Sequence, residues 1–142
     1  MENNINTLDE LNKGCSMGMT ALDFILEKVD AYDFKELIEK QYKEYQILSN
    51  KIDELYREYT NEAIHETSVI EKVMTWYGIQ KDTILDDSVS KLADLLINGT
   101  NMGIIEGRKL LNNKTMDKKV HKLCNEYVKV QEKYIEKLKK FL

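Results

Sequence analysis

Hydrophobic residues recur at alternating spacings of three and four along most of this chain, the pattern of an α-helix that is buried on one side. The first such segment begins with Thr7 and has Glu10 three residues later, which is the spacing of a helix-starting capping box. The pattern therefore predicts a helix over residues 7–29. Its inward stripe consists of Leu8, Leu11, Cys15, Gly18, Leu22, Ile25 and Val29.

Three further segments have the same period and predict helices over residues 34–59, 88–111 and 117–142. The stretch between the second and third helices, residues 60–86, is a long connection with an amphipathic piece of its own from Val69 to Tyr77, ending at Gly78. The candidate N-caps are Asp33, then Asp86 or Asp87, then Asp117. The inward stripes are Leu37, Gln41, Tyr45, Leu48, Ile52, Leu55 and Tyr59; Val89, Leu92, Leu96, Gly99, Gly103 and Leu110; and Val120, Leu123, Tyr127, Val130, Tyr134, Leu138 and Phe141.

Composition supports an all-α fold, because the chain has no proline and only six glycines to interrupt long helices or build β-turns. Its 142 residues suit one domain with a core of its own. We therefore expect residues 1–142 to form a single four-helix bundle.

Five of the six glycines lie inside predicted helices, where each costs about 1 kcal/mol relative to alanine. Gly14 and Gly18 flank a segment that recurs 85 residues later between Gly99 and Gly103. The repeat indicates two duplicated helical hairpins, 7–59 and 87–142, joined by the crossover 60–86; coincidence is the alternative. We expect the two glycine pairs to face each other and let the first and third helices approach more closely than the usual ~8–10 Å. Alternatively, the missing side chains make room for a ligand.

Two such hairpins with a long crossover resemble the ferritin-like superfamily. That resemblance implies a core with two metals, held by a Glu on the first and third helices and an E-x-x-H on the second and fourth. The corresponding residues here do not provide that set, since amides and phenols are poor substitutes for carboxylate and imidazole on iron. We therefore expect no di-iron site and no cofactor. The residues at these positions are Glu10, Glu106, Gln41, Glu44, Gln131 and Tyr134.

Two weaker metal patterns occur elsewhere. Glu62 and His65 form an E-x-x-H with Glu66 beside it, but at the start of the crossover, where a solvated polar turn is the simpler interpretation. His121 and Cys124 stand three residues apart without a third ligand.

Several polar residues fall on faces that should point inward: Gln41, Tyr45, Glu106, Tyr127 and Tyr134. Buried polar groups need partners, so a hydrogen-bond network is one interpretation. A small cavity where an ancestral metal site was lost is the other.

Charge and targeting signals narrow the function classes. A net charge of −4 with interleaved Lys and Glu argues against nucleic-acid binding. No apolar run approaches the ~18 residues of a membrane span, and the first residues lack a signal-peptide pattern. The two cysteines form no CxxC, which suits reduced thiols in the cytoplasm.

These observations favour a cytoplasmic, metal-free binding or assembly module that forms a homo-oligomer and is more plausibly not an enzyme. The segment 74–77, with Trp76, is the expected contact surface, unless the crossover simply packs across the bundle. The alternative is a metal-binding or oxidoreductase ferritin-like protein with atypical ligands. Those ligands would be Glu44, Glu106, Glu126 and His121.

Overall fold

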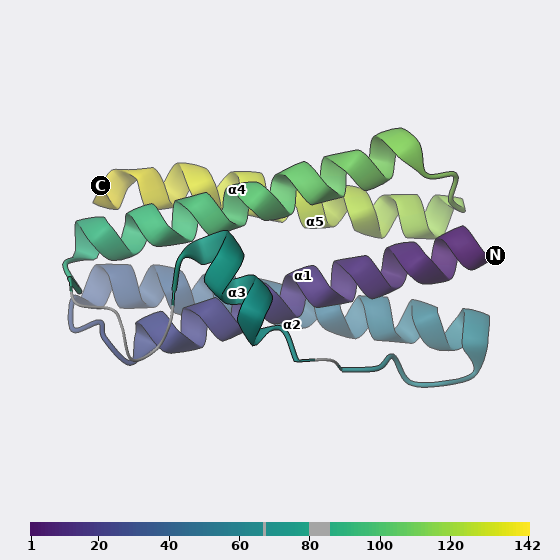
Figure 1. The fold of residues 1–142 in the computed structure, drawn as a ribbon, viewed down its shortest axis with the longest axis horizontal. Coiled ribbons are helices and arrows are strands. Elements are labelled where there is room, and N and C mark those ends of the chain that lie inside the picture. Colours follow the sequence, from purple (N-terminus) through teal and green to yellow (C-terminus); the bar gives the residue numbers. More distant parts are fainter. Residues whose placement is uncertain (67, 80–85) are drawn as a thin grey trace.

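The computed structural model describes residues 1–66, 68–79 and 86–142, and within these ranges all regular secondary structure is helical (Figure 1). This confirms the predicted all-α class. Residues 67 and 80–85 of the predicted crossover lie outside the described residues. The helices are α1 Glu2–Leu26, α2 Tyr32–Thr60, α3 Ile70–Tyr77, α4 Val89–Asn113 and α5 Lys118–Leu138, followed by a 3-10 turn, Lys139–Phe141.

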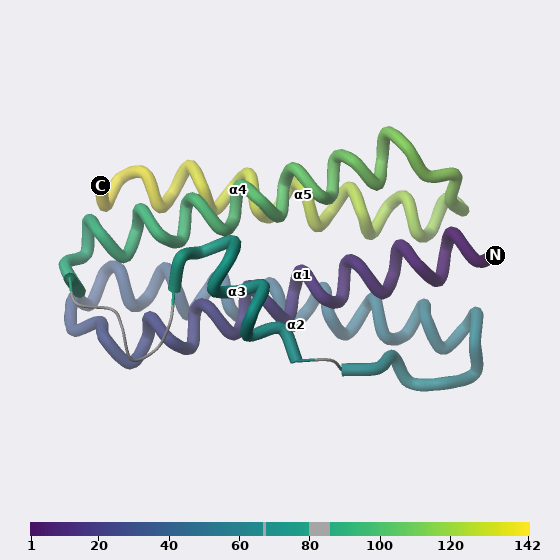
Figure 2. Tube along the Cα trace, in the orientation of Figure 1, coloured from purple at the N-terminus to yellow at the C-terminus, as the bar shows by residue number. Residues whose placement is uncertain are grey.

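The four long helices run side by side as two antiparallel hairpins, α1 with α2 and α4 with α5 (Figures 1 and 2). The hairpins also pack on each other, α4 beside α1 and α2 beside α5. Because α4 runs in the same direction as α2, the chain between them must return along the length of the molecule. The short helix α3 lies in that return and packs on both α1 and α4.

The core between these helices is continuous, from Leu8 near the start of α1 to Leu138 at the end of α5. At one end, Phe34 of α2 packs on Phe141, with ring centroids 5.1 Å apart. Burial of α2 is centred on a slightly different stripe from the predicted one, since Ile38 and Tyr56 are buried whereas Leu37 and Tyr59 are only partly so. In the described part of the chain, no helix has the length and apolar character needed to cross a bilayer.

The first helix begins at Glu2, earlier than the capping-box pattern at Thr7 predicts. Thr7 is buried inside the helix instead of capping it. The reason is a tertiary contact: the Asn4 side chain accepts a 2.8 Å hydrogen bond from the backbone N–H of Asp117, so the first turn docks on the α4–α5 connection. A partner from far along the chain therefore stabilises a turn that local sequence leaves uncapped.

The caps of the middle helices differ in detail from the predicted ones. Helix α2 begins one residue before Asp33, which therefore lies in its first turn. The cap of α4 is Ser88, whose hydroxyl accepts from the N–H of Lys91 at 3.3 Å, while Asp86 accepts from the N–H of Ser88 at 3.0 Å. Helix α3 ends at Gly78 as predicted, in the left-handed conformation that glycine adopts most easily (φ 65°).

Candidate functional site

The helical glycines are buried against large side chains from neighbouring helices. A Cβ placed on Gly18 of α1 would lie 2.6 Å from ring atoms Cε2 and Cζ of Tyr45 in α2. At Gly99 of α4 a Cβ would overlap the ring of Tyr77, which α3 inserts into the core. In both places the absent side chain is what allows the tyrosine ring to lie against the helix backbone.

The other two glycines of the repeat lie against side chains of α5. Gly14 lies under the hydroxyl of Tyr127, and Gly103 lies under the amide of Gln131. At all four repeat positions, therefore, the nearest atoms belong to tyrosine or glutamine side chains and not to the facing glycine pair. The expected direct contact of glycine on glycine is corrected accordingly: the glycines are packing positions, but they accommodate side chains.

These side chains form a polar centre in the interior. The Tyr45 hydroxyl donates a 3.3 Å hydrogen bond to Oε1 of Gln131, and both residues are about 1% exposed. Tyr77 and Tyr127 lie nearby and are also buried. Burial raises the pKa of all three phenols, so they are neutral at physiological pH.

The hydrogen bonding of this polar centre is incomplete. Among the described residues, Gln41 Oε1, Thr100 Oγ1 and Gln131 Nε2 are buried without a hydrogen-bond partner. A buried polar group without a partner carries a desolvation penalty, typically about 1–3 kcal/mol. Of the residues that the sequence placed in a polar core, Tyr45 has a hydrogen bond to Gln131, and Gln41 and Tyr127 are buried near it.

The remaining two predicted core residues lie outside this centre. Tyr134 is buried next to an ion pair between Lys133 and Glu44. The ammonium nitrogen of Lys133 lies 5.1 Å from the centre of the Tyr134 ring and 2.7 Å from a carboxylate oxygen of Glu44. Glu106 is not a core residue: its side chain is 44% exposed and pairs with Lys109 at 3.4 Å. It lies on the side of α4 that borders a groove.

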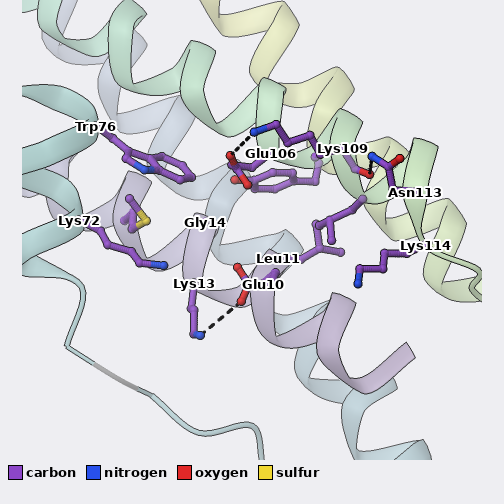
Figure 3. Close-up of a pocket in the computed structure, with 14 residues that line it drawn as sticks. Glu10, Leu11, Lys13, Gly14, Lys72, Trp76, Glu106, Lys109, Asn113 and Lys114 are labelled. Atoms are coloured by element: carbon purple, nitrogen blue, oxygen red, sulfur yellow. Dashed lines mark hydrogen bonds and ion pairs between the residues drawn. The ribbon is translucent and has the colours of Figure 1, made fainter. Parts of the chain in front are cut away.

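That groove lies between α1, α3 and α4 and has a volume of about 320 Å³ (Figure 3). Trp76 of α3 forms one wall, and Gly14, Gly107 and the Tyr127 ring lie among its lining residues. The apolar part of the lining also includes Leu11, Met17 and Leu110. Its polar lining consists of Glu10, Lys13, Lys72, Glu106, Lys109, Asn113 and Lys114.

The structure also places the segment 74–77 that was expected to form a contact surface. Met74, at 38%, and Thr75 are exposed, whereas Tyr77 is inside the core and Trp76 faces the groove. The alternative interpretation, in which the crossover packs across the helices, describes α3 correctly.

The candidate metal ligands do not come together. Glu62 and His65 are exposed in the non-helical stretch after α2. Glu44 pairs with Lys133, Glu126 pairs with Lys51 at 3.2 Å, and His121 is exposed. Throughout the ranges that the structure describes, no three His, Cys, Asp or Glu residues are grouped closely enough to hold a metal ion.

Both thiols are held protonated by their surroundings. Burial raises the pKa of Cys15, which lies in the core, and raises that of Cys124 to about 11. The Cys124 thiol donates to the backbone oxygen of Gly107 at 3.6 Å. Neither is therefore an activated nucleophile.

No protein-family model, curated protein or solved structure matches this chain. The groove and the polar centre are the features of the chain that bear on its function. Sequence reasoning missed the groove, because its lysines are ordinary surface residues in the sequence and come from three separate helices. Sequence analysis singled out Glu10, Gly14, Trp76, Glu106 and Tyr127 separately, but it did not bring them together at one site.

Proposed function

We propose that this protein is a binding module whose ligand is a small organic molecule held in the groove between α1, α3 and α4. The observation that carries the proposal is the groove itself, which has about 320 Å³ of space between three helices and an indole on one wall. Small-molecule sites in proteins typically start at about 300 Å³ and combine an apolar lining with a few placed polar groups. This groove fits that description at its lower end.

The position of Trp76 supports a ligand contact. It lies on α3, next to Tyr77, whose ring is fixed in the core against Gly99. The buried Tyr77 side chain fixes this turn of α3, and the backbone that carries the Trp76 indole at the groove is therefore held in place. Aromatic side chains held in this way provide large contact area at low entropic cost.

The test uses Trp76 as a reporter, because it is the chain's single tryptophan. A library of small aromatic and aliphatic compounds should contain members that shift its fluorescence and raise the melting temperature. Calorimetry on Trp76→Ala should then show the binding lost, whereas Met74→Ala, an exposed residue of the same helix outside the groove, should bind normally. If no compound changes either signal, or both variants bind equally, the groove is not a ligand site.

We also infer that the architecture is a ferritin-like pair of duplicated hairpins without a di-iron centre. The direction of the four long helices supports it. So does a correspondence between the two halves: Gly18 receives Tyr45, and Gly103 receives Gln131, which stands 86 residues after Tyr45. Superposing 7–59 on 87–142 in an experimental structure should align these pairs. A different register would refute the duplication, and stoichiometric metal in protein purified without chelator would refute the metal-free assignment.

A further inference from the structure

We propose that the ligand of the groove is a small amphipathic anion, with a phosphate or carboxylate held by lysine side chains and an apolar or planar body against Trp76. This inference rests on the proposed function, and it adds the chemical class of the ligand.

The groove lining is basic, although the chain as a whole is acidic. The full sequence has 25 acidic and 21 basic residues, whereas the lining contains four lysines and two glutamates. Local charge opposite in sign to the net charge indicates that the groove attracts anions, which the remaining surface repels.

The two glutamates are already paired with lysines on their own helices. Glu10 lies 3.4 Å from Lys13 on α1, and Glu106 lies 3.4 Å from Lys109 on α4. Figure 3 shows these pairs on different walls of the groove. The side-chain ammonium groups of Lys72 and Lys114 have no ion-pair or hydrogen-bond partner in the described part of the chain. The uncompensated charge of the lining is therefore positive.

Lys72 and Trp76 form the part of the groove that suits an amphipathic ligand. They are four residues apart on α3 and thus lie on the same helix face. Figure 3 shows the Lys72 side chain extending from α3 toward α1, below the indole. An anionic group at the Lys72 ammonium would therefore place an attached ring or chain near the indole and the apolar residues beyond it.

The groove can hold only a small body. About 320 Å³ accommodates a compound of one or two rings. An amphipathic compound would use both kinds of lining, since inorganic phosphate alone leaves the apolar walls unused.

The test compares phenyl phosphate with inorganic phosphate, benzyl alcohol and benzylamine, followed by Trp76 fluorescence and by calorimetry at two salt concentrations. We expect phenyl phosphate to bind most tightly, and we expect its affinity to fall as the salt concentration increases. Lys72→Gln should raise its Kd about fivefold or more. Lys122→Gln is the matched control, because Lys122 is an exposed α5 lysine outside the groove. The Kd of phenyl phosphate for this variant should equal that for the wild type.

Each failure has a distinct meaning. If benzyl alcohol or benzylamine binds as tightly as phenyl phosphate, or if both lysine variants behave alike, the anion assignment is overturned while the groove remains a ligand site. If inorganic phosphate binds as tightly as phenyl phosphate, the amphipathic part is wrong. If neither these probes nor the wider library changes fluorescence or melting temperature, the proposed function itself fails, and the ligand class fails with it.

Discussion

Replacing Gly18 with alanine tests whether the helical glycines exist to accommodate buried side chains. The new Cβ would stand 2.6 Å from two ring carbons of Tyr45, so the ring must retreat by roughly 0.8 Å to reach the 3.4 Å of ordinary contact. Tyr45 is 1% exposed and its hydroxyl is bonded to Gln131, so it has little freedom to move. Overpacking of this kind costs about 1–3 kcal/mol, whereas alanine gains about 1 kcal/mol in helix propensity.

A double-mutant cycle separates these two effects. In the wild-type background the steric term should dominate and Gly18→Ala should lower stability by up to ~2 kcal/mol, with each kcal/mol worth about 2–4 °C in melting temperature. In a Tyr45→Leu background the clashing ring carbons are gone, so the same change should raise stability by about 1 kcal/mol. The expected coupling between the two positions is therefore about 1–3 kcal/mol.

Urea denaturation followed by circular dichroism measures the four variants of this cycle. Asp23, exposed on the same helix, supplies the control: the difference between Asp23→Ala and Asp23→Gly gives the propensity term without a packing change. If Gly18→Ala has the same effect with tyrosine or leucine at position 45, the glycine does not serve to seat the ring, and the packing account is wrong.

Three further predictions concern the buried polar groups. Burial and a neighbouring carboxylate raise the pKa of Tyr59 from 10.0 to about 12, so the folded chain favours the neutral phenol. The contribution of this group to stability should be constant below pH 10 and be lost between pH 10 and 12, so a Tyr59→Phe variant should lose less stability than the wild type over that interval in urea titrations. Tyr45→Phe should cost about 1–3 kcal/mol because it leaves the Gln131 amide without its partner, and adding Gln131→Leu should recover most of that loss in the same assay. Both thiols should resist iodoacetamide in the native state, Cys15 most of all, and mass spectrometry showing Cys15 alkylated before the protein unfolds would contradict its burial.

The local pattern of the sequence determined the helices themselves. The period of the apolar residues located four long helices, and the absence of proline with few glycines excluded a β-rich fold. The short helix α3 was also predictable, because its apolar face and its terminal Gly78 are neighbours in the chain. The start of α1 was not, since Asn4 bonds to the backbone of Asp117 and local capping rules contain no information about such a partner.

The sequence also identified residues that mattered without showing what they contact. Glycines inside helices are costly enough to require a reason, and Gly14, Gly18, Gly99 and Gly103 do have packing roles. The partner at each position is a tyrosine ring or a glutamine amide from another helix. Which side chain takes that place depends on how the helices are rotated about their axes relative to one another. Rotation is decided by the fit of the whole core, in which every side chain constrains its neighbours.

The groove is the feature that only the tertiary structure decided. Lys72 and Trp76 are neighbours on one helix, but their position opposite Lys109 and Lys114 arises because α3 crosses between α1 and α4. Glu106 illustrates the same limit: its place in the helical period suggested the core, and the rotation of α4 put it at the edge of the groove. Periodicity records which residues share a helix face, whereas the packing of separate helices determines which faces meet and which leave space for a ligand.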